Sequence, residues 1–248
     1  MPGDNTENNA PRFPSADGEA ALFRTYAVPF LLFMGFSVLL LVAEGSVKWD
    51  HPCAAWWQRM PELPVYALQV AACAAYLWRV RRGVEWRCTP GACLLGVLAG
   101  LLGIGLWLVP YVMGWIPREG GFMPELVLGH GTLATAAAYG LRFLRAAVVV
   151  PFIEEFFWRG YLMRWCVNRD EPHRVPLGQG SLLSYAVVTL AFMLVHTPAD
   201  YPAAFLYGTL AYLVVIYTRQ LVPVVLMHAV ANLVMGICAV SLNLPHLW

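Results

Sequence analysis

The chain has 248 residues, of which 59% are hydrophobic and 12% are charged, and its mean hydropathy is +0.59. A soluble globular domain is usually about 45–50% apolar and about 25% charged, so this composition excludes an ordinary soluble domain and indicates an integral membrane protein. The formal net charge of +1 excludes a basic surface of the kind that binds nucleic acid, and no nucleic-acid partner is expected.

The first segment, residues 1–20, is polar and rich in Pro, Asn and acidic residues, which predicts a disordered tail. No basic region opens directly onto the first apolar run, and no small-residue cleavage site follows Leu41. We therefore expect no removable signal peptide. Residues 21–248 show no internal repeat, long linker or soluble module, and they are expected to fold as a single transmembrane helical domain.

Apolar runs follow one another through this domain, and a spanning helix needs roughly 17–25 mostly apolar residues. The runs are Tyr26–Ala43, Leu63–Trp78, Ala92–Ile116, Phe143–Trp165, Leu182–His196, Pro202–Tyr217 and Val222–Leu242. The segment Glu125–Gly140 is shorter and more mixed, so the count is seven or eight. Because an open strand edge leaves backbone groups unsatisfied in lipid, the predicted fold class is all-α. We expect a polytopic membrane protein of seven to eight transmembrane helices with an intramembrane polar site.

The arginines near the ends of the runs indicate orientation, because cytoplasmic loops carry an excess of Lys and Arg. A cytoplasmic N-terminus is predicted by Arg12, Arg24, Arg79, Arg81, Arg82 and Arg87. If Glu125–Gly140 does not span, the later arginines that also fall inside are Arg164, Arg169, Arg174 and Arg219, whereas Arg142 and Arg145 fall outside. If the segment spans, these two sets exchange sides, so the charges favour the non-spanning arrangement.

Two adjacent carboxylates, Glu154 and Glu155, lie near the middle of the run Phe143–Trp165. A charge at the centre of a span costs about 2.5–3.5 kcal/mol on insertion scales, and such residues usually mark function. Glu155 and Arg159 are four residues apart and can pair on one helix face. Glu154 points about 100° away and has no evident partner on its own helix, which suits a general base. A Glu–Arg clasp between helices accounts for Glu155 and Arg159 but leaves Glu154 unexplained.

Two further polar pairs occur in later runs, each with a spacing of four residues: Phe192 with His196, and His228 with Asn232. This spacing places both members of a pair on one helix face. A packed core histidine is the alternative for either imidazole alone. Together with Glu154, these residues supply a base, two tunable donors and a fixed amide donor, which suit activation of water and stabilisation of an oxyanion.

A zinc site is the competing interpretation, because Glu154, His196 and His228 form a plausible three-ligand set with an open fourth position. No His-Glu-x-x-His sequence is present, and Asn232 is a poor zinc ligand and a good oxyanion donor. The 6 cysteines show no Cys-x-x-Cys spacing, and we interpret them as packed thiols rather than as a disulfide framework or a metal site. The prediction is therefore a site without a metal or another cofactor.

The three motifs EEFFWR, FMLVH and HAVAN stand in this order in the chain. They resemble the CAAX protease and bacteriocin-processing family, whose pattern is EExxxR, FxxxH and HxxxN on transmembrane helices. The resemblance covers about residues 143–235, the motif-bearing core. The family includes the type II CAAX prenyl endopeptidases, which remove the last three residues after the modified cysteine of prenylated proteins. It therefore implies an intramembrane protease with an eight-helix core.

The resemblance also implies a role for each motif residue. Glu154 would be the catalytic base, His196 would orient and polarise the water, and His228 and Asn232 would hold the oxyanion. The supporting residues would be Glu155, Arg159 and Phe192. No metal is implied by the prevailing view of the family, although earlier work treated it as a metalloprotease.

The expected function is an intramembrane endopeptidase that hydrolyses a peptide bond near the membrane, in a multi-pass protein of the plasma membrane. Its partners would be the lipid bilayer and a peptide or protein substrate, possibly lipid-modified or C-terminally tagged. Bacterial members of the family also act in bacteriocin self-immunity, peptide maturation and protein sorting. The alternatives are a non-catalytic scaffold or bacteriocin-immunity protein, a zinc-dependent membrane protease, and a transporter with a proton relay, against which the absence of internal repeats counts.

Overall fold

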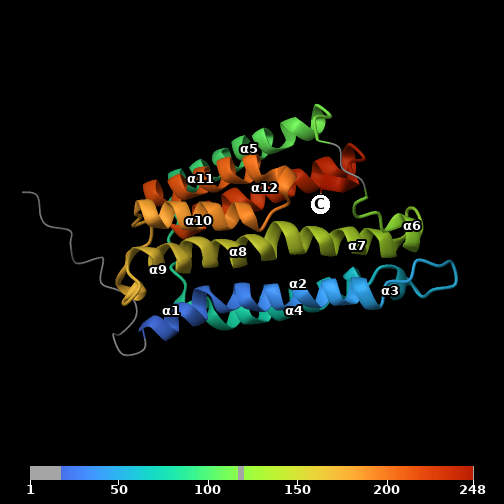
Figure 1. The fold of residues 1–248 in the computed structure, drawn as a ribbon, viewed down its shortest axis with the longest axis horizontal. Coiled ribbons are helices and arrows are strands. Elements are labelled where there is room, and N and C mark those ends of the chain that lie inside the picture. The colour runs from blue at the N-terminus through green and yellow to red at the C-terminus, as the bar shows by residue number, and fades with distance from the viewer. Residues whose placement is uncertain (1–17, 117–119, 248) are drawn as a thin grey trace, which may run out of the picture.

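In a computed structural model of the chain, residues 18–116 and 120–247 are described, and they are helices joined by turns and loops, with no strand. A helical run from Leu133 to Val167, 35 residues long, passes through the middle of the molecule (Figure 1). On one side of it lie α1 (Gly18–Tyr26), α2 (Val28–Ser46) and α4 (Glu62–Val80). On the other side lie α5 (Pro90–Val112), α10 (Leu182–Leu194), α11 (Tyr201–Thr218) and α12 (Leu221–Ser241).

Within the described residues, 6 helices are long and apolar enough to cross a membrane. They are Val28–Ser46, Glu62–Gly83, Pro90–Val112, Leu133–Val167, Pro198–Thr218 and Leu221–Ser241. The helix α10 is apolar but shorter, with 13 residues. The all-helical membrane fold is therefore confirmed, and the expected seven to eight helices are close to six long helices and one short helix.

The segment Glu125–Gly140 does not form a span of its own. A short helix, α6 (Glu125–Leu128), ends at Gly129, and the backbone turns through Gly129 and Gly131, which have φ of 90° and 68°. Glycine adopts such positive φ values without the steric cost that a side chain would bring. The next helix, α7 (Leu133–Phe143), then begins behind Thr132, whose side chain accepts a hydrogen bond from the Thr135 N–H. This agrees with the non-spanning arrangement that the charge pattern favoured, and the expectation of eight helices is not confirmed.

The long central run changes its helical register twice. After α7 comes the π-helical segment η3 (Leu144–Val149), then α8 (Val150–Glu155), the π-helical segment η4 (Phe156–Leu162) and α9 (Met163–Val167). Pi-helical turns inside α-helices occur frequently at functional sites. The two carboxylates of the sequence motif lie in α8, between the two π-helical segments.

Pro151 explains why the first register change leaves a carbonyl available. The Val150 N–H donates to the Arg145 carbonyl, five residues back. In that register the next donor, the N–H of residue 151, would serve the Ala146 carbonyl, but proline has no N–H. A buried carbonyl needs a donor from elsewhere. The Ala146 carbonyl accepts a hydrogen bond of 2.8 Å from the side-chain amide of Asn232 on α12.

Helices α5 and α12 pack closely because two glycines, Gly96 and Gly100, face the α12 backbone. A Cβ on Gly96 would meet the Pro223 carbonyl oxygen at 2.1 Å, and a Cβ on Gly100 would meet the Met227 carbonyl oxygen at 2.5 Å. Glycines four residues apart allow such backbone approach between transmembrane helices. This contact fixes the part of α12 that carries His228, next to Met227.

One end of the bundle gathers most of the arginines, and we call it the arginine-rich end. Arg164 on α9 pairs with Glu85, α1 packs against the turn η5 (Pro172–Arg174), and the Thr89 N–H donates to Gln220 Oε1. These contacts bring together Arg24, Arg79, Arg81, Arg82, Arg87, Arg164, Arg169, Arg174 and Arg219. Figure 1 shows α1 and α9 at this end and α3 (Trp56–Arg59) and α6 at the other. Arg142 and Arg145, expected in an outside loop, instead lie within the central helical run.

Two further expectations need correction or stay open. Cys88 and Cys93 form a disulfide with Cα atoms 6.4 Å apart, within the usual range for such a bond. The prediction of packed thiols without a disulfide is therefore wrong for this pair, which the start of α5 brings together. Most of the predicted tail lies outside the described residues, and Gly18 already begins α1.

Candidate active site

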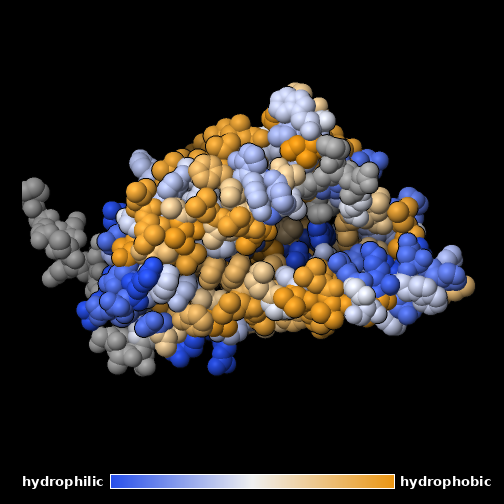
Figure 2. Space-filling model, viewed as in Figure 1, coloured by the Kyte–Doolittle hydropathy of each residue, from blue (hydrophilic) through white to orange (hydrophobic). Residues whose placement is uncertain are grey.

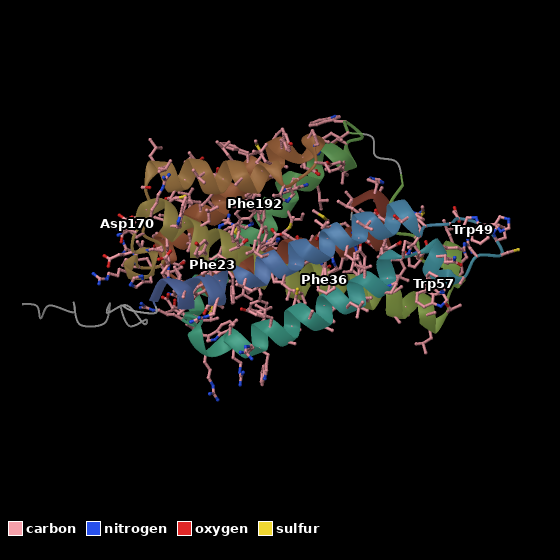
Figure 3. The ribbon with its side chains drawn as sticks, turned by 60° about the horizontal axis from the view of Figure 1, so that its bottom comes forward. Phe23, Phe36, Trp49, Trp57, Asp170 and Phe192 are labelled. Atoms are coloured by element: carbon pink, nitrogen blue, oxygen red, sulfur yellow. A yellow bond between two sulfur atoms is a disulfide. The ribbon has the colours of Figure 1, made fainter. Side chains whose placement is uncertain are left out.

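A cavity of about 520 Å³ lies between the central run and the helices on its α5–α12 side. Its lining includes four residues predicted to be catalytic: Glu154, His196, His228 and Asn232. They come from three helical segments far apart in the sequence. Figure 2 shows a hollow between the two helix groups with hydrophilic atoms inside it. Figure 3 places Phe192, which also lines the cavity, in the middle of the molecule, away from Trp49 and Trp57 at one end and Asp170 at the other.

Glu155 is fully buried and has two partners. Its Oε2 lies 2.8 Å from an Arg159 guanidinium nitrogen, and its Oε1 accepts a hydrogen bond of 2.9 Å from His228 Nδ1. The side chains of Glu155 and Arg159 are both 0% exposed. The predicted pairing of Glu155 with Arg159 is confirmed. The sequence did not predict a partner for His228, and α12 brings this imidazole to the second oxygen of the same carboxylate.

Glu154, the adjacent carboxylate, has a different environment. It is half-buried and lines the cavity. Among the described residues it has no hydrogen bond and no ion pair. The positive charge of Arg145 acts on it from the same helical run, and Arg145 lines the same cavity. The carboxylate is therefore available to a molecule bound in the cavity.

His196 lies two residues beyond the end of α10, and a contact with the backbone of that helix fixes its orientation. Its Nδ1 is 2.7 Å from the Phe192 carbonyl oxygen, so Nδ1 carries the hydrogen and donates it. In the neutral ring this leaves Nε2 as the acceptor. The imidazole lies between the rings of Phe192 and Trp107, at centroid distances of 4.7 and 5.2 Å. His196 thus presents one defined nitrogen.

His228 and Asn232 are oriented by contacts outside their own helix. The bond to Glu155 requires a hydrogen on His228 Nδ1, because an ionised carboxylate only accepts. Nε2 is then a donor only when the ring carries both protons, and the Glu155 carboxylate is the counter-charge for that form. Asn232 uses one amide N–H on the Ala146 carbonyl and retains the second N–H.

The Phe192 ring packs against Arg159 and against both histidines. The ring is 1% exposed and lies 5.3 Å from the Arg159 guanidinium carbon. On its other sides it contacts the His196 ring and, at a centroid distance of 6.5 Å, the His228 ring. Arg159 also donates to the Gly208 carbonyl at 3.4 Å. The aromatic ring therefore holds the two histidines at fixed positions around an apolar centre.

Sequence reasoning missed a buried carboxylate, Asp200, in the turn between α10 and α11. It accepts hydrogen bonds from the Trp107 indole at 3.1 Å, from the Tyr111 hydroxyl, and from the Thr197 hydroxyl at 2.6 Å. Asp200 is 5% exposed and lines the cavity. It anchors the turn that follows His196. The signal in the sequence was an acidic residue between two apolar runs, which looked like an ordinary loop residue.

The competing zinc interpretation requires three ligands close together. In residues 18–116 and 120–247, no group of three His, Cys, Asp or Glu side chains is arranged so that it could hold a metal ion. The ligand set Glu154, His196 and His228 shares a cavity but is not gathered as a metal-binding cluster. The residues present therefore do not fit the zinc interpretation.

Residues 136–234 match the family model described as "Type II CAAX prenyl endopeptidase Rce1-like". The match contains all three sequence motifs and begins within α7. No curated protein and no solved structure matches the chain. The family implies a membrane-embedded protease that acts on peptide substrates in a lipid bilayer. The recognition made from the three motifs is confirmed by this match, because residues 136–234 carry all three motifs and match the Rce1-like model.

Proposed function

We propose that Glu154 is the general base of an intramembrane endopeptidase, which activates the water that attacks the scissile carbonyl carbon. The observation that supports this most strongly is the contrast between two adjacent residues. Glu154 faces the cavity with no hydrogen bond or ion pair among the described residues, whereas Glu155 is fully buried with two partners. A carboxylate already bonded to Arg159 and His228 has no free oxygen for water, and Glu154 has two.

The reaction needs one base, one oriented water and one stabilised oxyanion. Water adds to the carbonyl carbon as Glu154 takes one proton from it. His196 Nε2 accepts a hydrogen bond from the other O–H of the water and so orients the water. The oxyanion that forms accepts hydrogen bonds from His228 Nε2–H and from the second amide N–H of Asn232. Glu154 then gives its proton to the leaving amine as the C–N bond breaks.

Glu155, Arg159 and Phe192 act through the histidines rather than on the substrate. Glu155 holds His228 by Nδ1 and supplies the counter-charge for its doubly protonated ring. Arg159 in turn pairs with Glu155 and holds it in place. These are positioning residues, and their burial explains why charged groups are tolerated at this depth in the bilayer.

A non-catalytic scaffold or bacteriocin-immunity protein is the second candidate. It accounts for the buried Glu155–Arg159 pair, which joins α8 to η4 and to α12. It gives no physical reason for an unpaired carboxylate at a cavity that also holds two oriented histidines. The proposed enzyme lies in a plasma membrane, and its substrate is lipid-modified or carries a C-terminal tag.

The test is a pair of variants purified in detergent, assayed with fluorogenic peptides. Some peptides carry a farnesylated C-terminal Cys-a-a-X sequence, and others are unmodified but have an apolar anchor. Glu154→Gln keeps the shape of the side chain and should lower kcat by about 10²–10⁴-fold. Glu171→Gln, at a surface pair with Arg174, is the matched control and should cleave like the wild type. Cleavage by Glu154→Gln within about tenfold of the wild type would remove Glu154 from the role of base.

A further inference from the structure

Charge is distributed unequally between the two ends of the bundle. The arginine-rich end carries the arginines named above against Glu19, Glu85, Asp170 and Glu171. At the opposite end, the described charged residues, in helix ends and loops, are Glu44, Lys48, Asp50, Arg59, Glu62 and Glu125. Exposed tryptophans occur at both ends, including Trp78 and Trp86 at the first and Trp49 and Trp56 at the second. Such aromatic side chains favour the two membrane–water interfaces, so the two ends are two faces of the membrane.

The cavity occupies the half of the bundle away from the arginine-rich end. Helix α5 starts at the arginine-rich end, and its last turns supply Trp107 and Tyr111 to the cavity. Helix α12 also starts there, and the segment after it supplies Leu247. The turn between α10 and α11 supplies Thr197 and Asp200. Among residues 18–116 and 120–247, none at the arginine-rich end lines the cavity.

The short hairpin of α10 and α11 explains why the hollow lies in that half. Helix α10 has 13 residues and is therefore about 20 Å long, against about 30 Å for the hydrocarbon core. It starts at Ser181, whose carbonyl accepts from the Tyr212 hydroxyl near the arginine-rich end. The hairpin turns back before it reaches the opposite face. Irregular backbone at such depth is tolerated only where it is buried in protein or lines a cavity, and this turn does both.

We infer that the cavity opens toward the non-cytoplasmic face, and that the substrate is the peptide segment beside the membrane anchor of a translocated protein. The inference rests on the proposed protease function for its substrate, but its topology stands on the charges and the cavity alone. Cytoplasmic ends of spans carry the excess of Lys and Arg, which places the arginine-rich end inside. A peptide in the cytoplasm would meet the end of the bundle whose described residues do not line the cavity.

One contact opposes this orientation, the disulfide between Cys88 and Cys93 at the arginine-rich end, because disulfides persist in oxidising compartments. The free energy of the charges at this end decides between the disulfide and the charge distribution. Each Lys or Arg near an anionic cytoplasmic surface contributes about 1 kcal/mol, and many arginines act together at this end. The disulfide is a single feature at this end, and the charge of the whole end outweighs it.

The chain has a built-in reporter for the test, because Cys53 is an exposed free cysteine at the opposite end. Spheroplasts of a bacterium that expresses the full chain are treated with a membrane-impermeant maleimide. Cys53 should be labelled in intact spheroplasts, and Cys53→Ser should lose that labelling. In the Cys53→Ser background, Asp170→Cys at the arginine-rich end should be labelled only after permeabilisation. Labelling of Asp170→Cys in intact spheroplasts, with Cys53 protected, would overturn the inference.

A second variant tests the cavity itself and needs no catalytic activity. Val195 lines the cavity and is 53% exposed. Val195→Cys in the Cys53→Ser background should react with a small impermeant methanethiosulfonate added to intact spheroplasts. Reaction only after permeabilisation would mean that the cavity opens to the cytoplasm, and a lipid-modified cytoplasmic C-terminus would then be the substrate class. Both readouts are labelling yields, so loss of the proposed protease function would leave them unchanged.

Discussion

Two adjacent residues of helix α8, Glu154 and Glu155, have opposite surroundings. On one side, Glu155 is closed in by Arg159, His228 and the Phe192 ring, and every charge there has a counter-charge. On the other side, Glu154 faces a cavity of about 520 Å³ with no partner among the described residues. One residue of separation turns the side chain by about 100°. The packed side therefore fixes the position of His228, and the cavity side leaves Glu154 free to react with a bound molecule.

The largest expected effect is a loss of stability when the packed side of α8 loses Glu155. Glu155→Ala leaves Arg159 buried without its counter-charge, and loss of one partner of a buried pair costs about 3–5 kcal/mol in the free energy of unfolding. Thermal unfolding in detergent measures it, with Glu154→Gln as the matched variant that should change stability little. The double variant Glu155→Ala with Arg159→Met should recover part of the loss. If it is less stable than the two single changes predict together, the residues do not act as a pair.

The next largest expected effect is a fall in kcat when His228, which connects the two sides, is removed. His228→Ala removes the donor that Glu155 positions, and loss of one oxyanion donor usually lowers kcat by about 10²–10³-fold. KM should stay close to that of the wild type, because the interaction is made in the transition state. His51→Ala, in an exposed loop at the far end, is the control. A rise in KM at unchanged kcat would show that His228 binds the substrate in its ground state instead.

A smaller effect tests why Asn232 lies where it does. Asn232→Leu leaves the Ala146 carbonyl without its donor, which should cost about 1–3 kcal/mol in stability. Pro151→Ala returns a backbone N–H to the helix and should recover part of that stability. It should not recover the activity, because the oxyanion donor is still missing. If Pro151→Ala gives no recovery of stability, the proline is not the reason that the carbonyl needs an outside donor.

The sequence predicted what depends on neighbours along the chain and little of what depends on contacts between helices. Apolar runs gave most of the helices, and a spacing of four residues gave the Glu155–Arg159 pair. The partner of His228 was missed because Glu155 lies 73 residues away, on a helix whose relative position no periodicity shows. Asp200 was missed for the same reason, since Trp107 and Tyr111 come from another helix. The two glycines that separate α6 from α7 were visible in the sequence and decide the number of spans.

The smallest expected effect is that of metal removal, which should change nothing. A zinc site would need His196 and His228 to turn one nitrogen each toward a common point with Glu154. Each ring donates its Nδ1–H, to the Phe192 carbonyl and to Glu155, so only Nε2 could bind a metal. Among the described residues these nitrogens and Glu154 are not gathered into a metal-binding group. Asn232, beside them, offers an N–H where a zinc site needs a lone pair. The purified enzyme should keep its activity after dialysis against EDTA and then phenanthroline, with far less than one zinc per chain by elemental analysis. Loss of activity that stoichiometric zinc restores would make Glu154, His196 and His228 ligands, and the water on the metal would then replace the glutamate-activated water.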